Sequence, residues 1–225
     1  MFSLTIAALA LLSGVRGDSW GPAFSLGPTA SAIIEATTTF NPGTPPKNPV
    51  DALFLWPGVS NATSGLIQSG ADSIGDMSAY CGASAGQWCV SASYFGVVDG
   101  QTTQLSGPLV PVNGNTPINI HYKLASDQKT WDQTVTVNGQ VISTLKSYDG
   151  PLINGGWGTG TELQASSKGT ESVQTYTNTT IILQSADLTF INTRGIGSGV
   201  VASDMLTADN GKTWTIASIT IPSMN

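Results

Sequence analysis

The chain has 225 residues, of which 40% are hydrophobic and only 10% charged, and its formal net charge at neutral pH is −6. Its 8 lysines and arginines form no basic run, so we expect neither nucleic acid nor an anionic membrane as a partner. The 26 glycines and 12 prolines are typical of strands separated by turns, and the length suffices for one large all-β domain or two small ones.

Residues 1–17 have the pattern of a secretory signal peptide. Their apolar run is too short to span a bilayer, and Val15 and Gly17 are suitable residues for cleavage before Asp18. The pattern predicts a secreted, extracellular protein. We expect its mature part, residues 18–225, to be a single domain that acts as a monomer.

Two sequons and two cysteines are consistent with export. The sequons begin at Asn61 and Asn178 and are candidate glycosylation sites. Cys81 and Cys89 favour one disulfide that closes a short loop, with two free thiols or a metal pair as alternatives. His121 is the only histidine and completes no zinc site, so we expect no metal and no cofactor.

Strand-like runs follow one another along the chain, and no helical period stands out. Runs rich in β-branched or apolar residues predict strands at 30–40, 52–56, 64–68, 88–95, 117–124, 131–137, 140–145, 179–184, 187–191 and 213–221. Strands in this number require two packed antiparallel sheets or a barrel.

Two of these runs carry sharper signals. Asn138 and Gly139 join two strands and predict a hairpin with a type I′ turn. In residues 117–124 the apolar and polar side chains alternate, which is typical of a half-exposed antiparallel strand. His121 lies on the polar side, so we expect it to face solvent or the wall of a groove.

Gln68 and Glu162 are the polar residues on which the functional hypothesis depends. Gln68 ends a short apolar run, and the small residues after it predict a turn. Glu162 is one of three glutamates and lies in a strand-like run, residues 158–165. A glycine-rich stretch, residues 154–160, leads into this run, and we expect that stretch to be flexible. An amide that donates hydrogen bonds and a carboxyl that exchanges a proton form a minimal pair for acid hydrolysis.

The order of motifs resembles the fungal glutamic peptidases, the eqolisin family (peptidase family G1). The matching stretches are residues 19–21, 33–42, 52–58, 66–72 and 161–163. Leu66-Ile-Gln-Ser-Gly-Ala-Asp72 is similar to the family's Ile-Leu-Gln-Thr-Gly-x-Asp, which carries the catalytic Gln. Thr161-Glu-Leu163 falls where the family has Ala-Glu-Phe/Trp, which carries the catalytic Glu.

The resemblance implies a fold and an activity. The family fold is a β-sandwich of two seven-stranded sheets, so we expect an all-β, two-sheet antiparallel β-sandwich of the concanavalin A-like jelly-roll type. The implied activity is acid endoproteolysis of a polypeptide substrate. Glu162 would take a proton from the attacking water, and Gln68 would stabilise the oxyanion. Trp20 would be a groove wall, with a core tryptophan as the alternative.

The groove of the family is altered here. Leu53 and Pro57 fall where the family has a groove Trp and an Asp. Cys89 falls near another family Asp, and Ser91 or Ser93 falls where a family Glu lies beside the dyad.

Two other functional classes remain open. A carbohydrate-processing enzyme needs two carboxyls across a groove, for which Glu35 and Glu162 are the candidates, and a lectin would bind a glycan. Trp56, Trp88, Trp131, Trp157 and Trp214 are able to stack on sugars, although aromatic residues in strands are more often core. A non-catalytic protein on the same scaffold is the third class.

Overall fold

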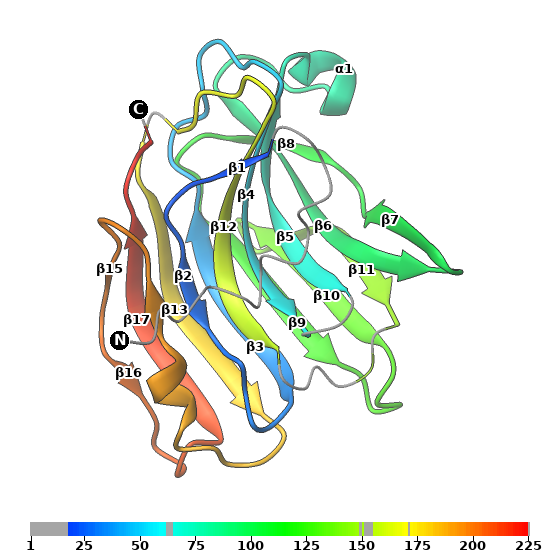
Figure 1. Cartoon of the computed structure of the whole chain (residues 1–225). Helices are drawn as coiled ribbons and strands as arrows, with labels where there is room; N and C mark the ends of the chain where they lie inside the picture. Colours follow the sequence, from blue (N-terminus) through cyan, green and yellow to red (C-terminus); the bar gives the residue numbers. More distant parts are fainter. Residues whose placement is uncertain (1–17, 62–64, 149, 151–154, 171, 225) are drawn as a thin grey trace.

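The computed structural model describes residues 18–61, 65–148, 150, 155–170 and 172–224, and these residues are almost entirely β-structure. They form one nine-stranded and one eight-stranded sheet, in which every pairing is antiparallel, as in a β-sandwich (Figure 1). The predicted signal peptide lies outside the described residues, as do Ala62 and Thr63 of the first sequon.

The nine-stranded sheet has the order β14-β2-β12-β4-β5-β6-β7, with β1 beside β12 and β8 beside β6. Its strands are β1 (Ser19–Trp20), β2 (Phe24–Leu26), β4 (Ala52–Ser60), β5 (Leu66–Ile74), β6 (Gln87–Val98), β7 (Gln101–Ser106), β8 (Val110–Asn113), β12 (Gly156–Gln164) and β14 (Gly195–Ile196).

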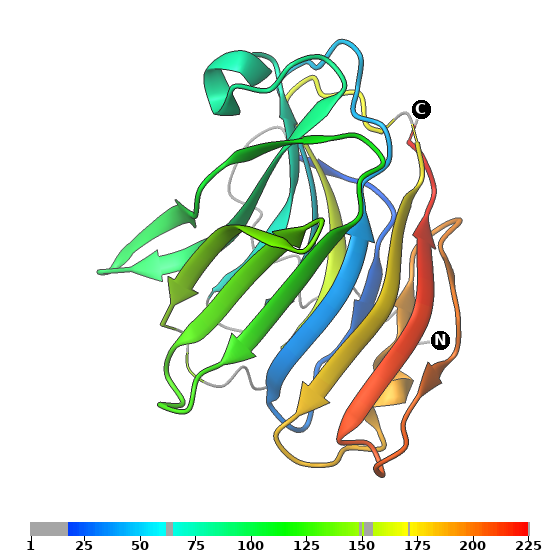
Figure 2. The same ribbon diagram turned by 180° about the vertical axis from the view of Figure 1, so that it is seen from behind.

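The eight-stranded sheet has the order β11-β10-β9-β3-β13-β17-β15, with β16 beside β17, and it faces the viewer in Figure 2. Its strands are β3 (Ile33–Asn41), β9 (Ile118–Leu124), β10 (Trp131–Val137), β11 (Gln140–Ser147), β13 (Gln174–Leu183), β15 (Val201–Ala202), β16 (Met205–Leu206) and β17 (Thr213–Ile221).

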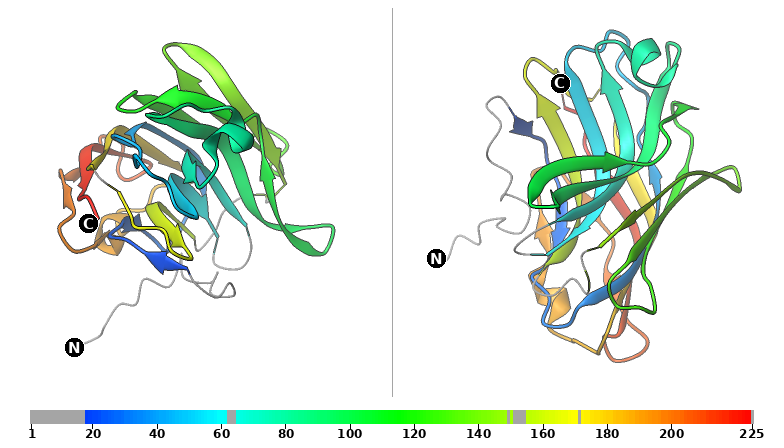
Figure 3. Two further views of the ribbon diagram at one scale, coloured as in Figure 1. Left: turned by 90° about the horizontal axis from the view of Figure 1, so that it is seen from above. Right: turned by 90° about the vertical axis from the view of Figure 1, so that its right-hand side faces the viewer.

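The core lies between the two sheets, which appear as two layers in Figure 3. In β9 the four apolar residues are buried, while Asn119 and Lys123 are exposed, as the alternation predicts. Hydrogen bonds also cross between the layers: the Tyr122 hydroxyl of β9 donates to the carbonyl of Pro57 on β4 at 2.8 Å. The predicted sandwich is thereby confirmed.

Four tryptophans belong to the core and not to a sugar-binding surface. Trp88, Trp131, Trp157 and Trp214 are at most 3% exposed. The indole N–H of Trp88 donates to the carbonyl of Gly43 at 3.0 Å, that of Trp131 to Gly150 at 2.7 Å and that of Trp214 to Gly211 at 2.9 Å. In these three residues the hydrogen bond offsets the cost of burying the indole N–H, as expected of tryptophans that belong to the core.

The predicted hairpin is confirmed. Strands β10 and β11 pair on either side of Asn138 and Gly139. Both turn residues have positive φ angles, 50° and 78°, as a type I′ turn requires.

Two expectations about glycine-rich segments are wrong. The turn predicted after Gln68 is instead the middle of β5, and the stretch expected to be flexible contributes the start of β12. Glycine is needed here for close packing: a Cβ on Gly70 would lie 2.1 Å from the carbonyl oxygen of Leu55, and one on Gly156 would lie 1.9 Å from that of Leu26.

The strand predicted at residues 187–191 is also wrong. The Asp187 carboxylate accepts hydrogen bonds from the backbone N–H and the hydroxyl of Thr189, at 2.8 and 2.6 Å, which closes a turn before the 3₁₀ helix η1 (Phe190–Thr193). A short helix without an apolar period in its sequence, α1 (Met77–Cys81), lies between β5 and β6. None of the described helices is long and apolar enough to cross a membrane.

Candidate functional site

A groove of about 290 Å³ lies on the face of the nine-stranded sheet that points away from the core. Neighbouring strands contribute alternate residues to it, because side chains on a strand point to opposite faces in turn. On β5, Gln68, Gly70 and Asp72 line the groove, whereas Ile67 and Ala71 belong to the core. The other lining residues are Asp18, Trp20, Phe54, Trp56, Leu66, Tyr80, Ser91, Ser93, Phe95, Gln104, Ser106, Glu162 and Gln164.

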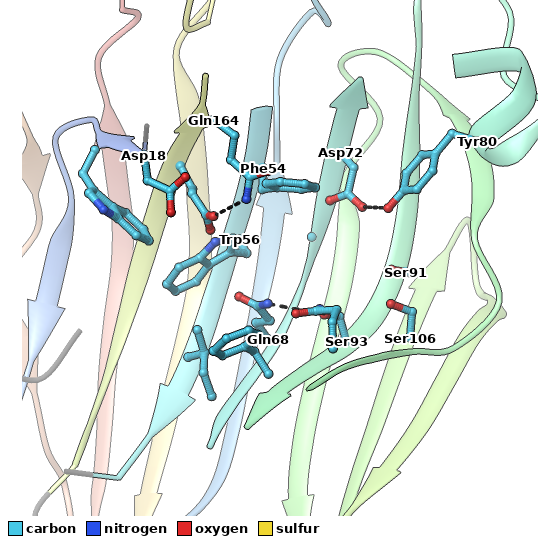
Figure 4. A pocket seen from close by; sticks show the side chains of 16 residues that line it. Asp18, Phe54, Trp56, Gln68, Asp72, Tyr80, Ser91, Ser93, Ser106 and Gln164 are labelled. Carbon is cyan, nitrogen blue, oxygen red and sulfur yellow. Dashed lines mark hydrogen bonds between the residues drawn. The ribbon is translucent and has the colours of Figure 1, made fainter. Parts of the chain in front are cut away.

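Gln68 is held by a single hydroxyl group. Its Nε2 donates to the Ser93 hydroxyl at 3.4 Å (Figure 4). The amide of Gln104 donates to the same hydroxyl. The Oε1 of Gln68 is buried and has no hydrogen-bond partner among the described residues. A buried carbonyl oxygen without a partner is costly, so a donor from a bound molecule would be favoured at this point.

Glu162 lies on β12, between Trp20 of β1 and Phe54 of β4 in the register of the sheet. Burial raises the pKa of its carboxyl. A hydrogen bond of 2.9 Å from the Gln164 amide and the nearby Trp56 indole lower that pKa, while the charge of Asp18 raises it. Because burial is the largest of these effects, Glu162 holds its proton to a higher pH than an ordinary glutamate.

Trp56 lies on the floor of the groove between the strands of Gln68 and Glu162. It is 3% exposed, and a Cβ on Gly160 would lie 2.3 Å from its Cε2 atom, so glycine at this position makes room for the indole. Trp20 meets it edge to face, with ring centroids 6.3 Å apart, and is itself 47% exposed. Trp20 therefore lines the groove at its rim.

The two predicted catalytic residues face the same groove but are not directly opposite. Glu162 pairs with Phe54, and Gln68 pairs with Gly58, four residues further along the intervening β4. Directly across from Glu162, Phe54 also pairs with Asp72 of β5. A molecule that touches both Gln68 and Glu162 has to lie across Trp56.

Asp72 is the second carboxyl in the groove, and the functional hypothesis did not include it. Burial raises its pKa to about 7; the Tyr80 hydrogen bond lowers it and the charge of Glu162 raises it. The Tyr80 hydroxyl donates to Oδ2 at 3.0 Å. Tyr80 lies on α1, beside Cys81, whose predicted disulfide with Cys89 is confirmed.

The altered groove positions are placed differently from the expectation. Leu53 and Pro57 are buried and do not line the groove. Side chains alternate between the two faces of β4, and Phe54 and Trp56 are the ones on the groove face. The Pro57 carbonyl instead binds Tyr122, as described above.

Among the remaining altered positions, Cys89 carries the disulfide, and Ser91 and Ser93 line the groove. The groove wall therefore has hydroxyls where a family carboxylate was expected.

Glu35 and His121 are remote from the groove. They lie on the other sheet, where Glu35 pairs with His121 at 2.7 Å and with Lys123 at 3.3 Å. The pair of Glu35 and Glu162 considered for sugar hydrolysis is therefore ruled out. In the described part of the chain, no three His, Cys, Asp or Glu side chains cluster as metal ligands would.

The two candidate glycosylation sites differ in exposure. Asn178 is exposed, at a bulge in β13 where its φ angle is 53°. Asn61 is half-buried, and the rest of its sequon lies outside the described residues.

Comparison with solved structures identifies the architecture. No protein-family model matches the chain, and no curated protein matches its sequence. Scytalido-glutamic peptidase bound to a transition-state analog inhibitor superimposes with a TM-score of 0.54 and 14% identity over 90% of this chain and 98% of that one. The chain has the fold of the glutamic peptidases.

A second complex of the same peptidase has this fold, and another eqolisin structure is a weaker match. A complex of scytalido-glutamic peptidase with a peptide-based transition-state analog gives a TM-score of 0.51 at 15% identity, over 90% of this chain and 98% of that one. SCP-B, described as an eqolisin in complex with the tripeptide Ala-Ile-His, gives 0.47 at 14% identity over the same shares. The resemblance read from the motifs is thus confirmed at the level of the fold.

Within this glutamic-peptidase fold, sequence reasoning missed Asp72 and Tyr80 as parts of the groove, and it considered Trp56 only as a sugar-stacking or core residue. Asp72 had a usable signal, since it follows Gln68 by four residues on a strand and so shares its face. Tyr80 had none, because it reaches the groove only through α1.

Proposed function

We propose that the chain is a glutamic-type acid endopeptidase, in which Gln68 and Glu162 hydrolyse a polypeptide bound across Trp56. The observation that carries the proposal is that these two residues, chosen from the sequence, line one groove of a protein with the fold of glutamic peptidases. The unpaired Oε1 of Gln68 and the half-buried carboxyl of Glu162 are the groups that a substrate or its attacking water would meet.

The proposed reaction needs only these two side chains and water. The Glu162 carboxylate takes a proton from a water molecule, whose oxygen attacks the carbonyl carbon of the peptide bond. The carbonyl electrons move to the oxygen, to which the Gln68 amide N–H donates a hydrogen bond. Glu162 then returns the proton to the peptide nitrogen as the carbon–nitrogen bond breaks.

The two carboxyls set the expected pH range. Glu162 must be ionised, so activity rises as the pH passes its raised pKa. Asp72, with a pKa of about 7, stays neutral in acid and adds a second negative charge to the groove above that pH. The profile is therefore expected to be bell-shaped, with its alkaline limb near pH 7.

The test is digestion of denatured casein or albumin between pH 3 and 8 by the wild type and variants. We expect Glu162→Gln to lose about 100-fold or more in rate, and Gln68→Ala about as much, because each removes a group that acts in the transition state. Glu35→Gln is the matched control, since it removes the same charge on the other sheet and should retain activity. Failure of the folded wild type to cleave either protein at any of these pH values would overturn the proposal.

A second candidate is hydrolysis of a glycoside by Asp72 and Glu162. It is favoured by one observation, that Asp72 and Glu162 are the register partners of Phe54 on the two neighbouring strands. Strands two positions apart are about 10 Å apart, similar to the spacing of the two carboxyls in inverting glycosidases. In this case Asp72→Asn would abolish the cleavage of a polysaccharide while Gln68→Ala retained it. Activity on neither substrate class would favour a non-catalytic protein.

A further inference from the structure

Helix α1 contributes one residue, Tyr80, to the lining of the groove, although the helix has little packing of its own. It is five residues long and none of its residues is buried. Asp76 caps its start, accepting a hydrogen bond from the N–H of Ala79 at 2.9 Å, and Gly82 ends it with a φ angle of 77°. A helix this short is not stable alone, so its position depends on tethers to the sheet.

Two tethers reach the sheet at the same place. The disulfide joins Cys81 of α1 to Cys89 of β6, and the Tyr80 hydroxyl binds Asp72 of β5. Asp72 and Cys89 are direct partners in the register of β5 and β6. The disulfide to Cys89 therefore holds Tyr80, the neighbour of Cys81, close to Asp72. Figure 4 shows the Tyr80 hydroxyl beside the Asp72 carboxyl.

The hydrogen bond has a defined direction. Burial, followed by the charge of Asp72, raises the pKa of Tyr80, so the phenol keeps its proton and donates it to Oδ2. The other carboxyl oxygen of Asp72 points away from the ring, toward the side of Phe54 (Figure 4). When Asp72 is neutral, its own proton is therefore available on the oxygen that faces the groove.

We propose that Tyr80 is a positioning residue, held in place by the Cys81–Cys89 disulfide, which orients Asp72 as a hydrogen-bond donor to a carbonyl oxygen of the bound peptide. This inference rests on the proposed peptidase function for its ligand. Removing the phenol frees the carboxyl to rotate, and removing the disulfide frees the phenol.

The groups that face Asp72 make its protonation sensitive to Tyr80. The ionisable groups that line the groove with it are Tyr80 from α1, Glu162 from β12 and Asp18 beside β1. No Lys, Arg or His is among these lining residues. Among the hydrogen bonds of the described residues, the Tyr80 hydroxyl is the side-chain donor to Asp72. Its loss should raise the pKa of Asp72 above about 7.

The first experiment follows the Asp72 carboxyl directly by carbon-13 NMR in the wild type, in Tyr80→Phe and in Tyr148→Phe. Tyr148 is 81% exposed, so its variant is a matched control. We expect the midpoint of about pH 7 to move up by about one unit in Tyr80→Phe alone, the effect of losing one hydrogen bond to the charged form. An unchanged midpoint would overturn the role of Tyr80, whether or not the protein is a peptidase.

The second experiment measures kcat and KM on a peptide for Tyr80→Phe, for Cys81→Ala with Cys89→Ala, and for all three changes together. We expect Tyr80→Phe to lower kcat about tenfold, the rate equivalent of one hydrogen bond. The disulfide variant should do the same, and the triple variant should lose little more, since both changes act through one contact. If the loss of kcat in the triple variant equalled the product of the losses in the other two variants, the link between the disulfide and Tyr80 would be overturned.

The two experiments distinguish a wrong role for Tyr80 from a wrong assignment of the protein as a peptidase. If the wild type cleaves no peptide, the peptidase proposal fails and the NMR titration still tests the Tyr80 contact. If the wild type cleaves peptides but Tyr80→Phe changes neither kcat nor the Asp72 midpoint, only the present inference fails.

Discussion

Gly160 shows at the scale of one residue how the groove depends on an absent side chain. The Trp56 indole occupies the space that a Cβ on Gly160 would need. The sequence before it, with three glycines in five residues, favours a flexible loop, whereas close packing against Trp56 and pairing with β4 make it part of a strand. Glycine has no side chain that reveals what it makes room for.

Gly160→Ala should therefore push the indole out of its place. We expect a loss of about 1–3 kcal/mol in the free energy of unfolding, typical of overpacking, together with a shift in tryptophan fluorescence. Urea unfolding and emission spectra provide the measurement. Gly75→Ala is the control, because its Cβ would come no closer than 3.8 Å, to the backbone nitrogen of Asp51. Equal stability of the two variants would contradict the packing argument.

At the scale of the element, the strands that could be predicted are those whose signal is local. The hairpin of β10 and β11 was located correctly, since Asn138-Gly139 determines the turn without help from the rest of the chain. The segment from Asp187 was not, because its β-branched composition was outweighed by hydrogen bonds from the Asp187 side chain. Helix α1 had no apolar period to find, as it has no buried face.

The hairpin turn offers a clean test of backbone conformation. Nothing lies within 4 Å of a Cβ built on Gly139, whose φ angle is 78°. Gly139→Ala should therefore cost about 1 kcal/mol through the left-handed backbone alone. Asn138→Gly should change the unfolding free energy by less than about 0.5 kcal/mol, because glycine accepts the same φ angle. Both changes in unfolding free energy can be measured by denaturant unfolding, from the shift of the midpoint at an unchanged m-value. If Gly139→Ala left the unfolding free energy unchanged, the assignment of the turn would be refuted.

For the whole molecule, the sequence alone predicted the two-sheet architecture and two residues that line the groove, but not most of the other side chains that line it. Gln68 and Glu162 were found because each stands in a strand-like run with a recognisable motif. Leu53 and Pro57 were assigned to the wrong face, since a shift of one residue along β4 reverses every side chain. Phe54 and Trp56 face the groove because of how β4 pairs with β5 and β12. This pairing joins segments that are distant in the sequence, so the local sequence of β4 does not reveal it.

The stability of the whole protein should depend on pH through Asp72. Its pKa is about 7 in the folded state and 3.8 without the fold, so the folded state holds the proton more tightly. The stabilisation is complete below about pH 4 and is lost as the pH rises to about 7. Because the side chain keeps some exposure, we expect a total of about 2 kcal/mol, roughly half the full linkage value.

Asp72→Asn is the variant that isolates this effect, because an amide mimics the neutral acid. The unfolding free energies of wild type and variant, measured from pH 4 to pH 8, should diverge in favour of the variant as the pH rises. Asp187 and Asp209, whose pKa values are lowered by hydrogen bonds, act in the opposite sense but equally in both proteins. A difference that does not vary with pH would show that Asp72 is not buried as described.

The alternation of groove and core residues along the same strands has a consequence for protein engineering. Substitutions at Phe54, Gln68, Asp72, Ser91 and Ser93 alter the groove while leaving the inward-facing side chains untouched. A combinatorial library restricted to these positions would sample new recognition surfaces on an unchanged interior. An insertion or deletion of one residue in β4 or β5 would instead exchange the two faces and abolish folding. The fold should therefore tolerate substitutions on the groove face of these strands but not insertions or deletions within them.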